Sequence, residues 1–208
     1  MESVSDQFID QPRRRFLVAA TGALGGIGIA LAAWPFLNSM EPSQAAIGAG
    51  APIDVDISKI EPGQLILTEW RSRPIWVLHR TDAQLAALPK NNPRLSDPDS
   101  RQEQQLPQFV NGDFRALDPH IFVAVAICTH LGCVPNLKAE PGSLGPDWLG
   151  GFLCPCHGSR YDLSARVFDG SPAPLNIPIP PYWFKSEKIV RIGELKGGGK
   201  QDWAPAIW

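Results

Sequence analysis

The sequence predicts a largely β, loop-rich protein with one N-terminal transmembrane helix. Of its 208 residues, 21 are proline and 19 are glycine, which favours strands and loops over a helical bundle. Short apolar runs bounded by turn residues recur from residue 53 onward. A stretch of 22 residues, 16–37, contains no Asp, Glu, Lys or Arg. The formal net charge of −2 gives no indication of a nucleic-acid partner.

The N-terminal segment, residues 1–15, is polar and ends in three arginines. Arg13, Arg14, Arg15, Phe16 and Leu17 resemble a twin-arginine export signal, an address for proteins that are exported already folded. The alternative interpretation is an ordinary positive flank of a membrane anchor. Under either interpretation the arginines place the N-terminus in the cytoplasm.

The apolar stretch 16–37 has the length of a membrane span, because a helix of this size is about 33 Å long. We expect a retained single-pass anchor in the bacterial inner membrane, although the Ala-containing segment that follows leaves cleavage open. The chain after residue 38 then lies in the periplasm. Residues 38–52 predict a flexible linker, 53–196 a periplasmic domain, and 197–208 a C-terminal tail.

The expected strands cover residues 53–57, 64–69, 75–80, 121–127, 182–184 and 188–192. A helix capped by Thr81 is expected over 81–88, ending before Pro89. Residues 89–119 are polar and predict a long surface excursion without chemistry. The run 121–127 predicts a buried strand that leads into the first of two cysteine-containing loops.

The chemistry of the chain lies in two loops, 128–133 (Cys-Thr-His-Leu-Gly-Cys) and 154–159 (Cys-Pro-Cys-His-Gly-Ser). Each loop has two cysteines and one histidine, and together they hold all 4 cysteines of the protein. Two thiolates and two imidazoles fit either a structural zinc site or a 2Fe–2S centre with histidine on one iron. A third interpretation is two disulfides without a metal, which leaves both histidines unused.

A structural zinc site would leave two cysteines without a function, in an exported location where spare thiols oxidise. We therefore favour the iron–sulfur interpretation. The two loops resemble the cluster-binding boxes of the Rieske iron–sulfur proteins of cytochrome bc complexes. The similarity covers the motifs, the anchor, the linker and a proline-containing loop, 170–174. It implies a Rieske-type antiparallel β sandwich with a small cluster-binding subdomain at 127–174.

The resemblance implies one 2Fe–2S cluster and assigns its ligands. Cys128 and Cys154 would bind one iron, and His130 and His157 the other. Neutral histidines leave the cluster less negative, so Rieske potentials run from about −150 to +300 mV, against about −400 mV for plant-type ferredoxins.

The resemblance also implies a disulfide between Cys133 and Cys156. Ser159 and Tyr161 match hydroxyl donors that, in the family, hydrogen-bond a bridging sulfide and a cysteine sulfur. Residues 170–174 match the Pro loop that covers the cluster, with Ser171 at a position where the family commonly runs Gly-Pro directly.

The function implied by the resemblance is quinol–cytochrome c reduction by a membrane-bound, dimeric complex with cytochrome b and a c-type cytochrome as partners. His157, with His130 beside it, would take a proton and an electron from quinol, while Leu131 and Pro174 contact the quinol pocket. Two alternatives are the Rieske subunit of another exported oxidoreductase, such as arsenite oxidase, and a structural zinc module.

Overall fold

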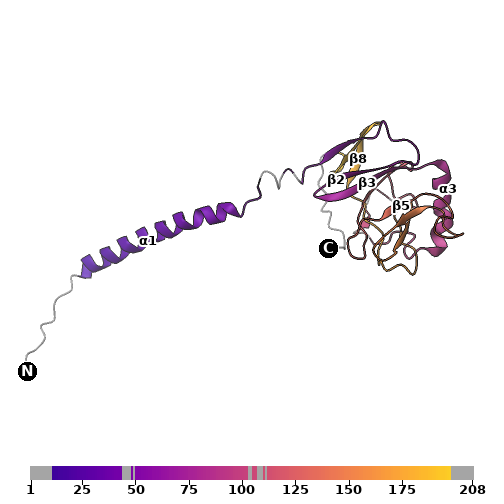
Figure 1. The fold of residues 1–208 in the computed structure, drawn as a ribbon. Coiled ribbons are helices and arrows are strands. Elements are labelled where there is room, and N and C mark those ends of the chain that lie inside the picture. The colour runs from indigo at the N-terminus through magenta and orange to yellow at the C-terminus, as the bar shows by residue number, and fades with distance from the viewer. Residues whose placement is uncertain are drawn as a thin grey trace, which may run out of the picture. The chain divides into compact units, whose positions relative to one another are not determined.

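The protein is described by a computed structural model covering residues 11–43, 48, 50–102, 105, 106, 110 and 112–197. The chain divides into two compact units, residues 1–47 and residues 48–208 (Figure 1). The predicted linker is thus described only in part, and the predicted tail lies outside the described residues apart from residue 197.

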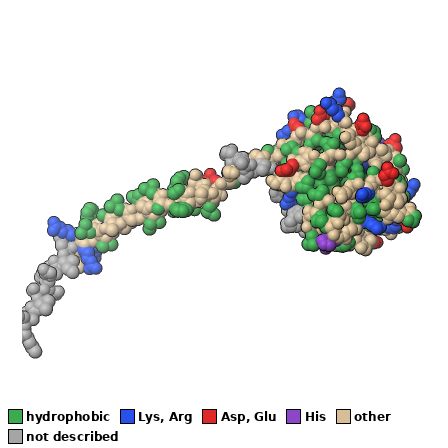
Figure 2. Space-filling view, in the orientation of Figure 1, with side chains coloured by type: hydrophobic (Ala, Val, Ile, Leu, Met, Phe, Trp, Pro, Cys, Tyr) green, Lys and Arg blue, Asp and Glu red, His purple; other side chains and the backbone are tan. Residues whose placement is uncertain are grey.

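The first unit contains helix α1 (Gln11–Ser39), which encloses the predicted span 16–37. None of its residues is buried, and it is long and apolar enough to cross a membrane. Figure 2 shows hydrophobic side chains along the helix and basic side chains at its N-terminal end. This distribution is typical of a membrane anchor with a positive flank.

The second unit is built from three antiparallel three-stranded sheets, with strand orders β1-β9-β8, β2-β3-β4 and β5-β6-β7. The strands of the first sheet are β1 (Ile53–Asp56), β8 (Tyr182–Ser186) and β9 (Ile189–Ile192). Those of the second are β2 (Leu65–Trp70), β3 (Arg73–His79) and β4 (Ile121–Val125). Those of the third are β5 (Asn136–Lys138), β6 (Gly151–Leu153) and β7 (Arg160–Asp162). The fold is therefore mostly β, as the sequence predicts.

The core joins the small third sheet to the second. All five residues of β4 are buried, as the apolar run in this part of the sequence predicts. Trp76 on β3 stacks on Phe152 on β6, with ring centroids 4.0 Å apart. Such a stack between two large buried rings adds to the free energy gained by burying their apolar surface. The strand that enters the second cysteine-containing loop is thereby fixed to the main body.

Helix α3 (Asp82–Asn91) differs from the prediction, because it continues through Pro89 and into a 3-10 turn, η1 (Asn92–Arg94). It begins with a capping box between Thr81 and Gln84. Proline costs most in the interior of a helix. Here it lies in the last turn, where the Asn92 N–H bonds the Pro89 carbonyl and closes the helix.

The prediction that residues 89–119 form only a surface excursion is wrong. Several of its described residues are buried, namely Asn91, Leu95, Ser100, Gln105, Val110 and Arg115. Residues 103, 104, 107–109 and 111 lie outside the described part of the chain. The excursion is polar because its side chains meet buried polar groups of the body, a relation that sequence periodicity cannot reveal.

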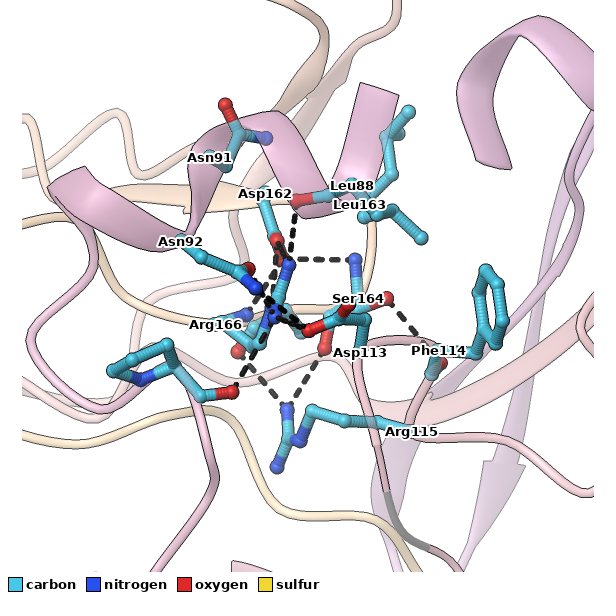
Figure 3. Close-up of polar contacts among 12 residues, drawn as sticks. Leu88, Asn91, Asn92, Asp113, Phe114, Arg115, Asp162, Leu163, Ser164 and Arg166 are labelled. Atoms are coloured by element: carbon cyan, nitrogen blue, oxygen red, sulfur yellow. Dashed lines mark hydrogen bonds and ion pairs between the residues drawn. The ribbon is translucent and has the colours of Figure 1, made fainter. Parts of the chain in front are cut away.

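A buried ion-pair network connects this excursion to the turn after β7 (Figure 3). Arg166 and Asp162 are both fully buried. Nε of Arg166 donates to Asp162 Oδ2 at 2.8 Å, and Nη2 of Arg166 lies 2.7 Å from the same oxygen. Arg166 also donates to Asn92 Oδ1, Asp113 Oδ1 and the Leu88 carbonyl at 2.8–2.9 Å. One arginine thus fixes α3, the excursion and the turn together.

Arg115, a second buried arginine, holds the same turn through backbone carbonyls. It donates to the carbonyls of Ser164 at 2.8 Å, Ala165 at 3.2 Å and Ile177 at 2.9 Å. Burial lowers its pKa to about 9, so the group remains charged at neutral pH. Ala165 has φ of 55°, a conformation that costs energy for a residue with a Cβ. The carbonyl contacts stabilise this turn, which directly follows the strand leaving the second loop.

We expect Asp162→Asn to lower the free energy of unfolding by about 3 kcal/mol, because it leaves Arg166 buried beside an uncharged amide. Denaturant titration of the purified chain measures this. The matched control is Asp99→Asn, which removes an ion pair with Arg101 in which both side chains are exposed, and should cost less than about 1 kcal/mol. Equal losses in the two variants would contradict a stabilising role for the buried pair.

Candidate metal centre

The two cysteine-containing loops extend from the small sheet. The first, 128–133, connects the buried strand β4 to β5, and the second, 154–159, connects β6 to β7. Because β5, β6 and β7 are neighbours in one antiparallel sheet, both loops emerge at the same end of it. The topology therefore brings together residues that are more than twenty positions apart in the sequence.

The two loops share one backbone hydrogen-bond pattern. The N–H of Gly132 donates to the Cys128 carbonyl at 3.0 Å, and the N–H of Gly158 donates to the Cys154 carbonyl at 3.0 Å. These glycines have φ of 85° and 74°, a conformation that favours glycine in a tight turn. Cys128 and Cys154 thus occupy equivalent positions at the start of matching turns.

The backbone hydrogen bonds also show which other positions of the two loops are equivalent. The N–H of Cys128 donates to the Cys133 carbonyl at 2.7 Å, and the N–H of Cys154 donates to the Ser159 carbonyl at 2.8 Å. The fifth residue after the first cysteine is therefore a cysteine in one loop and a serine in the other. The remaining cysteine, Cys156, belongs to neither of these equivalent positions.

The cysteines separate into two kinds. Cys133 and Cys156 form a disulfide with their Cα atoms 6.6 Å apart, as the family resemblance implies. Cys128 and Cys154 are free thiols, 1% and 2% exposed. The Sγ atoms of Cys133, Cys154 and Cys156 lie within 4.8 Å of one another, but sulfurs joined in a disulfide have no thiolate to offer a metal. Two thiols, Cys128 and Cys154, remain that could bind a metal.

Burial, together with the neighbouring Cys128 thiol, raises the pKa of the Cys154 thiol above its usual value. Without a metal this thiol therefore holds its proton at neutral pH. A soft metal ion displaces such protons, because the ligand is the thiolate.

The histidines complete the donor set. The rings of His130 and His157 meet edge to face with their centroids 4.7 Å apart. Nδ1 of His130 is buried and has no hydrogen-bond partner among the described residues. An unsatisfied buried nitrogen is costly unless it binds something. Two thiols and two imidazoles, one with such a nitrogen, therefore fit a Rieske-type cluster.

Tyr161 lies next to the first thiol. Its hydroxyl is 3.2 Å from Cys128 Sγ and accepts a hydrogen bond from the Thr129 N–H at 3.1 Å. Burial raises the pKa of the phenol further above neutrality, so the group keeps its proton. Thr129 donates its own hydroxyl proton to the Leu175 carbonyl at 2.6 Å. The Tyr161 proton can therefore go to the cysteine sulfur or to the Thr129 oxygen.

Ser159 is fully buried at the end of the second loop. Its hydroxyl oxygen accepts a hydrogen bond from the Ala173 N–H at 3.1 Å. Among the described residues, no protein atom accepts the Ser159 proton. Ser159 thus ends the second loop, and Tyr161 lies on β7 with its hydroxyl beside Cys128 of the first loop. The hydrogen bonds of these two hydroxyls also involve Thr129 and Ala173. The sequence gives no local signal for these two, since their partners are distant in the chain: Thr129 bonds Leu175 and Tyr161, and Ala173 bonds Ser159.

The outer side of the site is apolar and open. Leu131, next to His130, is 71% exposed, and both His157 and Pro174 are exposed. Exposed large apolar side chains beside polar groups are typical of interaction surfaces. The site is therefore asymmetric, with thiols inside and at least one imidazole at the surface.

Two family models match parts of this chain. A family model described as "Rieske [2Fe-2S] domain" matches residues 101–181. A second, "Ubiquitinol-cytochrome C reductase Fe-S subunit TAT signal", matches residues 5–43. A solved structure titled "Hyperthermophilic respiratory Complex III" is similar at 26% identity and a TM-score of 0.46, covering 82% of this chain and 97% of that one.

Two curated relatives carry the name "Ubiquinol-cytochrome c reductase iron-sulfur subunit". The protein of Allochromatium vinosum is 49% identical over 93% of this chain and 94% of its own length. The protein of Bradyrhizobium diazoefficiens is 44% identical over 88% of this chain and 96% of its own length. These similarities argue against the zinc interpretation. The chain belongs to the family of ubiquinol–cytochrome c reductase iron–sulfur subunits, whose Rieske domain holds one 2Fe–2S cluster.

Proposed function

We propose that the chain is the mobile electron carrier of a cytochrome bc complex, taking an electron and a proton from quinol and passing the electron to a c-type cytochrome. The observation that supports this most directly is the asymmetry of the site. The two free thiols are almost completely buried, whereas His157 and Leu131 are exposed. A substrate can therefore approach the imidazole side only.

The proposed ligands are Cys128 and Cys154 for one iron and His130 and His157 for the other. When bound, the cluster supplies a one-electron acceptor of high potential. Residues of the chain itself bind the quinol and accept its proton. His157 presents its ring to the surface and takes the quinol hydroxyl proton on the nitrogen that does not bind iron, with His130 beside it. Leu131 and Pro174 provide apolar contact around the quinol and exclude water from it.

The partners we propose are cytochrome b, which holds the quinol, and the c-type cytochrome of a dimeric complex. The match of a twin-arginine signal model to residues 5–43 and the apolar helix α1 support an exported, membrane-anchored chain. The three arginines at the start of α1 support a cytoplasmic N-terminus. We therefore place the head in the periplasm, anchored in the bacterial inner membrane. The names of the curated relatives favour this assignment over an arsenite oxidase-like subunit.

We expect His157→Ala to abolish the Rieske signal in electron paramagnetic resonance of the purified complex, because one iron loses a ligand. Iron and zinc analysis of the wild type should find iron without zinc. The matched control is His120→Ala, which removes an exposed histidine bonded to Asp82 outside the site. A wild-type spectrum in His157→Ala would refute the ligand assignment.

Ser159→Ala should retain the cluster but lower its midpoint potential by about 20–60 mV, the equivalent of a hydrogen bond worth about 0.5–1.5 kcal/mol. Quinol oxidation should slow with it. Redox titration measures the shift, and Ser143→Ala, which removes an exposed hydroxyl bonded to the Glu140 carbonyl, is the control. A midpoint equal to that of the wild type would count against the hydroxyl donor.

A moving head requires a flexible linker between anchor and domain. Replacing residues 45–50 with a proline-rich segment of the same length should slow quinol–cytochrome c turnover while the cluster's spectrum stays unchanged. A Gly/Ser-rich replacement of equal length is the control and should preserve turnover. Normal turnover with the stiff linker would contradict the proposed movement.

A further inference from the structure

The Pro loop, residues 170–174, makes hydrogen bonds to the second cluster-binding loop and to the strand that leaves it. The Ala173 N–H donates to Ser159 Oγ at 3.1 Å. The Arg160 N–H donates to Ser171 Oγ at 3.1 Å, and Ser171 Oγ donates to the Arg160 carbonyl at 3.4 Å. Both connections therefore reach adjacent residues of the chain, Ser159 and Arg160.

The contact from Ala173 restricts the Ser159 hydroxyl. A serine hydroxyl has one proton to donate and two lone pairs that accept. The Ala173 N–H occupies one of these lone pairs, and both residues are buried. Since the Ser159 proton has no protein acceptor among the described residues, it would be available to a cluster held by the two loops. A hydroxyl that accepts one bond is also polarised and donates more strongly.

Ser171 attaches the Pro loop to the strand that follows Ser159. Its side chain both accepts from and donates to the backbone of Arg160, which follows Ser159 directly. Its own N–H donates to the Phe168 carbonyl at 3.2 Å and closes the turn before Pro172. Pro172 has a fixed φ, which removes one of the backbone rotations between Ser171 and Ala173.

We propose that Ser171 is a positioning residue for the redox centre: by attaching the Pro loop to the backbone of Arg160, it holds the Ala173 amide against Ser159 Oγ and aims the Ser159 proton at the cluster. This inference rests on the proposed role of Ser159 as a hydrogen-bond donor. It assigns to the Ser171 side chain an effect on the cluster that it does not touch.

The test is a double-mutant cycle in the purified complex. Ser171→Ala should lower the ratio of reduced to oxidised cluster at a fixed ambient potential by about two- to tenfold, the effect of weakening one hydrogen bond. In a Ser159→Ala background the same change should have no further effect on that ratio. Ser171→Thr keeps the hydroxyl and should restore the wild-type ratio, and Ser143→Ala should leave it unchanged.

Hydrogen exchange provides a second readout that does not depend on activity. By mass spectrometry, the peptide covering residues 168–175 should exchange faster in Ser171→Ala and at the wild-type rate in Ser171→Thr. A wild-type ratio in Ser171→Ala, or a further shift in the Ser159→Ala background, would overturn the inference while leaving the proposed function intact. If Ser159→Ala itself shifts nothing, the proposed role of Ser159 fails, and this inference fails with it.

Discussion

The disulfide between Cys133 and Cys156 is the constraint on which the metal centre depends. The two loops are largely exposed at their tips, so burial of apolar surface contributes little to holding them together. A covalent bond across a sequence separation of 23 residues removes unfolded-state entropy worth about 3 kcal/mol. It links the two loops that carry the free thiols Cys128 and Cys154, the proposed ligands of one iron. The Pro loop adds hydrogen bonds from Ser171 and Ala173 to the second loop and to the first residue of β7.

The position of each ligand type follows its chemistry. Buried thiols are shielded from water and oxidants, and their negative charge as thiolates is compensated by the metal. The histidines lie closer to the surface, with His157 exposed and His130 half-buried. Ser159, at the end of the second loop, and Tyr161, on β7, are fully buried, so their hydrogen bonds act in a medium of low dielectric constant. The site therefore has an exposed imidazole on its outer side and buried thiols and hydroxyls on its inner side.

The body of the domain supports this site through buried polar contacts as well as through its apolar core. β7 leaves the second loop and runs directly into the turn held by Arg166 and Arg115. Three buried arginines in one small domain, Arg80 among them, are costly to desolvate, and they are tolerated because carboxylates and backbone carbonyls surround them. The excursion 89–119 supplies several of these partners. Its polarity in the sequence reflects this role, although polarity alone favours a solvent-exposed loop.

The sequence alone is enough to predict the class of the fold, the apolar helix and the two loops, because these features depend on local patterns: an uncharged run, short apolar strands and closely spaced Cys and His. It could not show that helix α3 passes through Pro89 or that Arg115 and Arg166 are buried, since both depend on partners distant in the chain. The tertiary structure was needed to show which nitrogen of His130 is unsatisfied and which group bonds the Ser159 hydroxyl, and it confirms the separation of free and disulfide-bonded cysteines that the family resemblance implies. Each of these is a property of groups that approach one another across the fold, and spacing along the chain does not determine such distances.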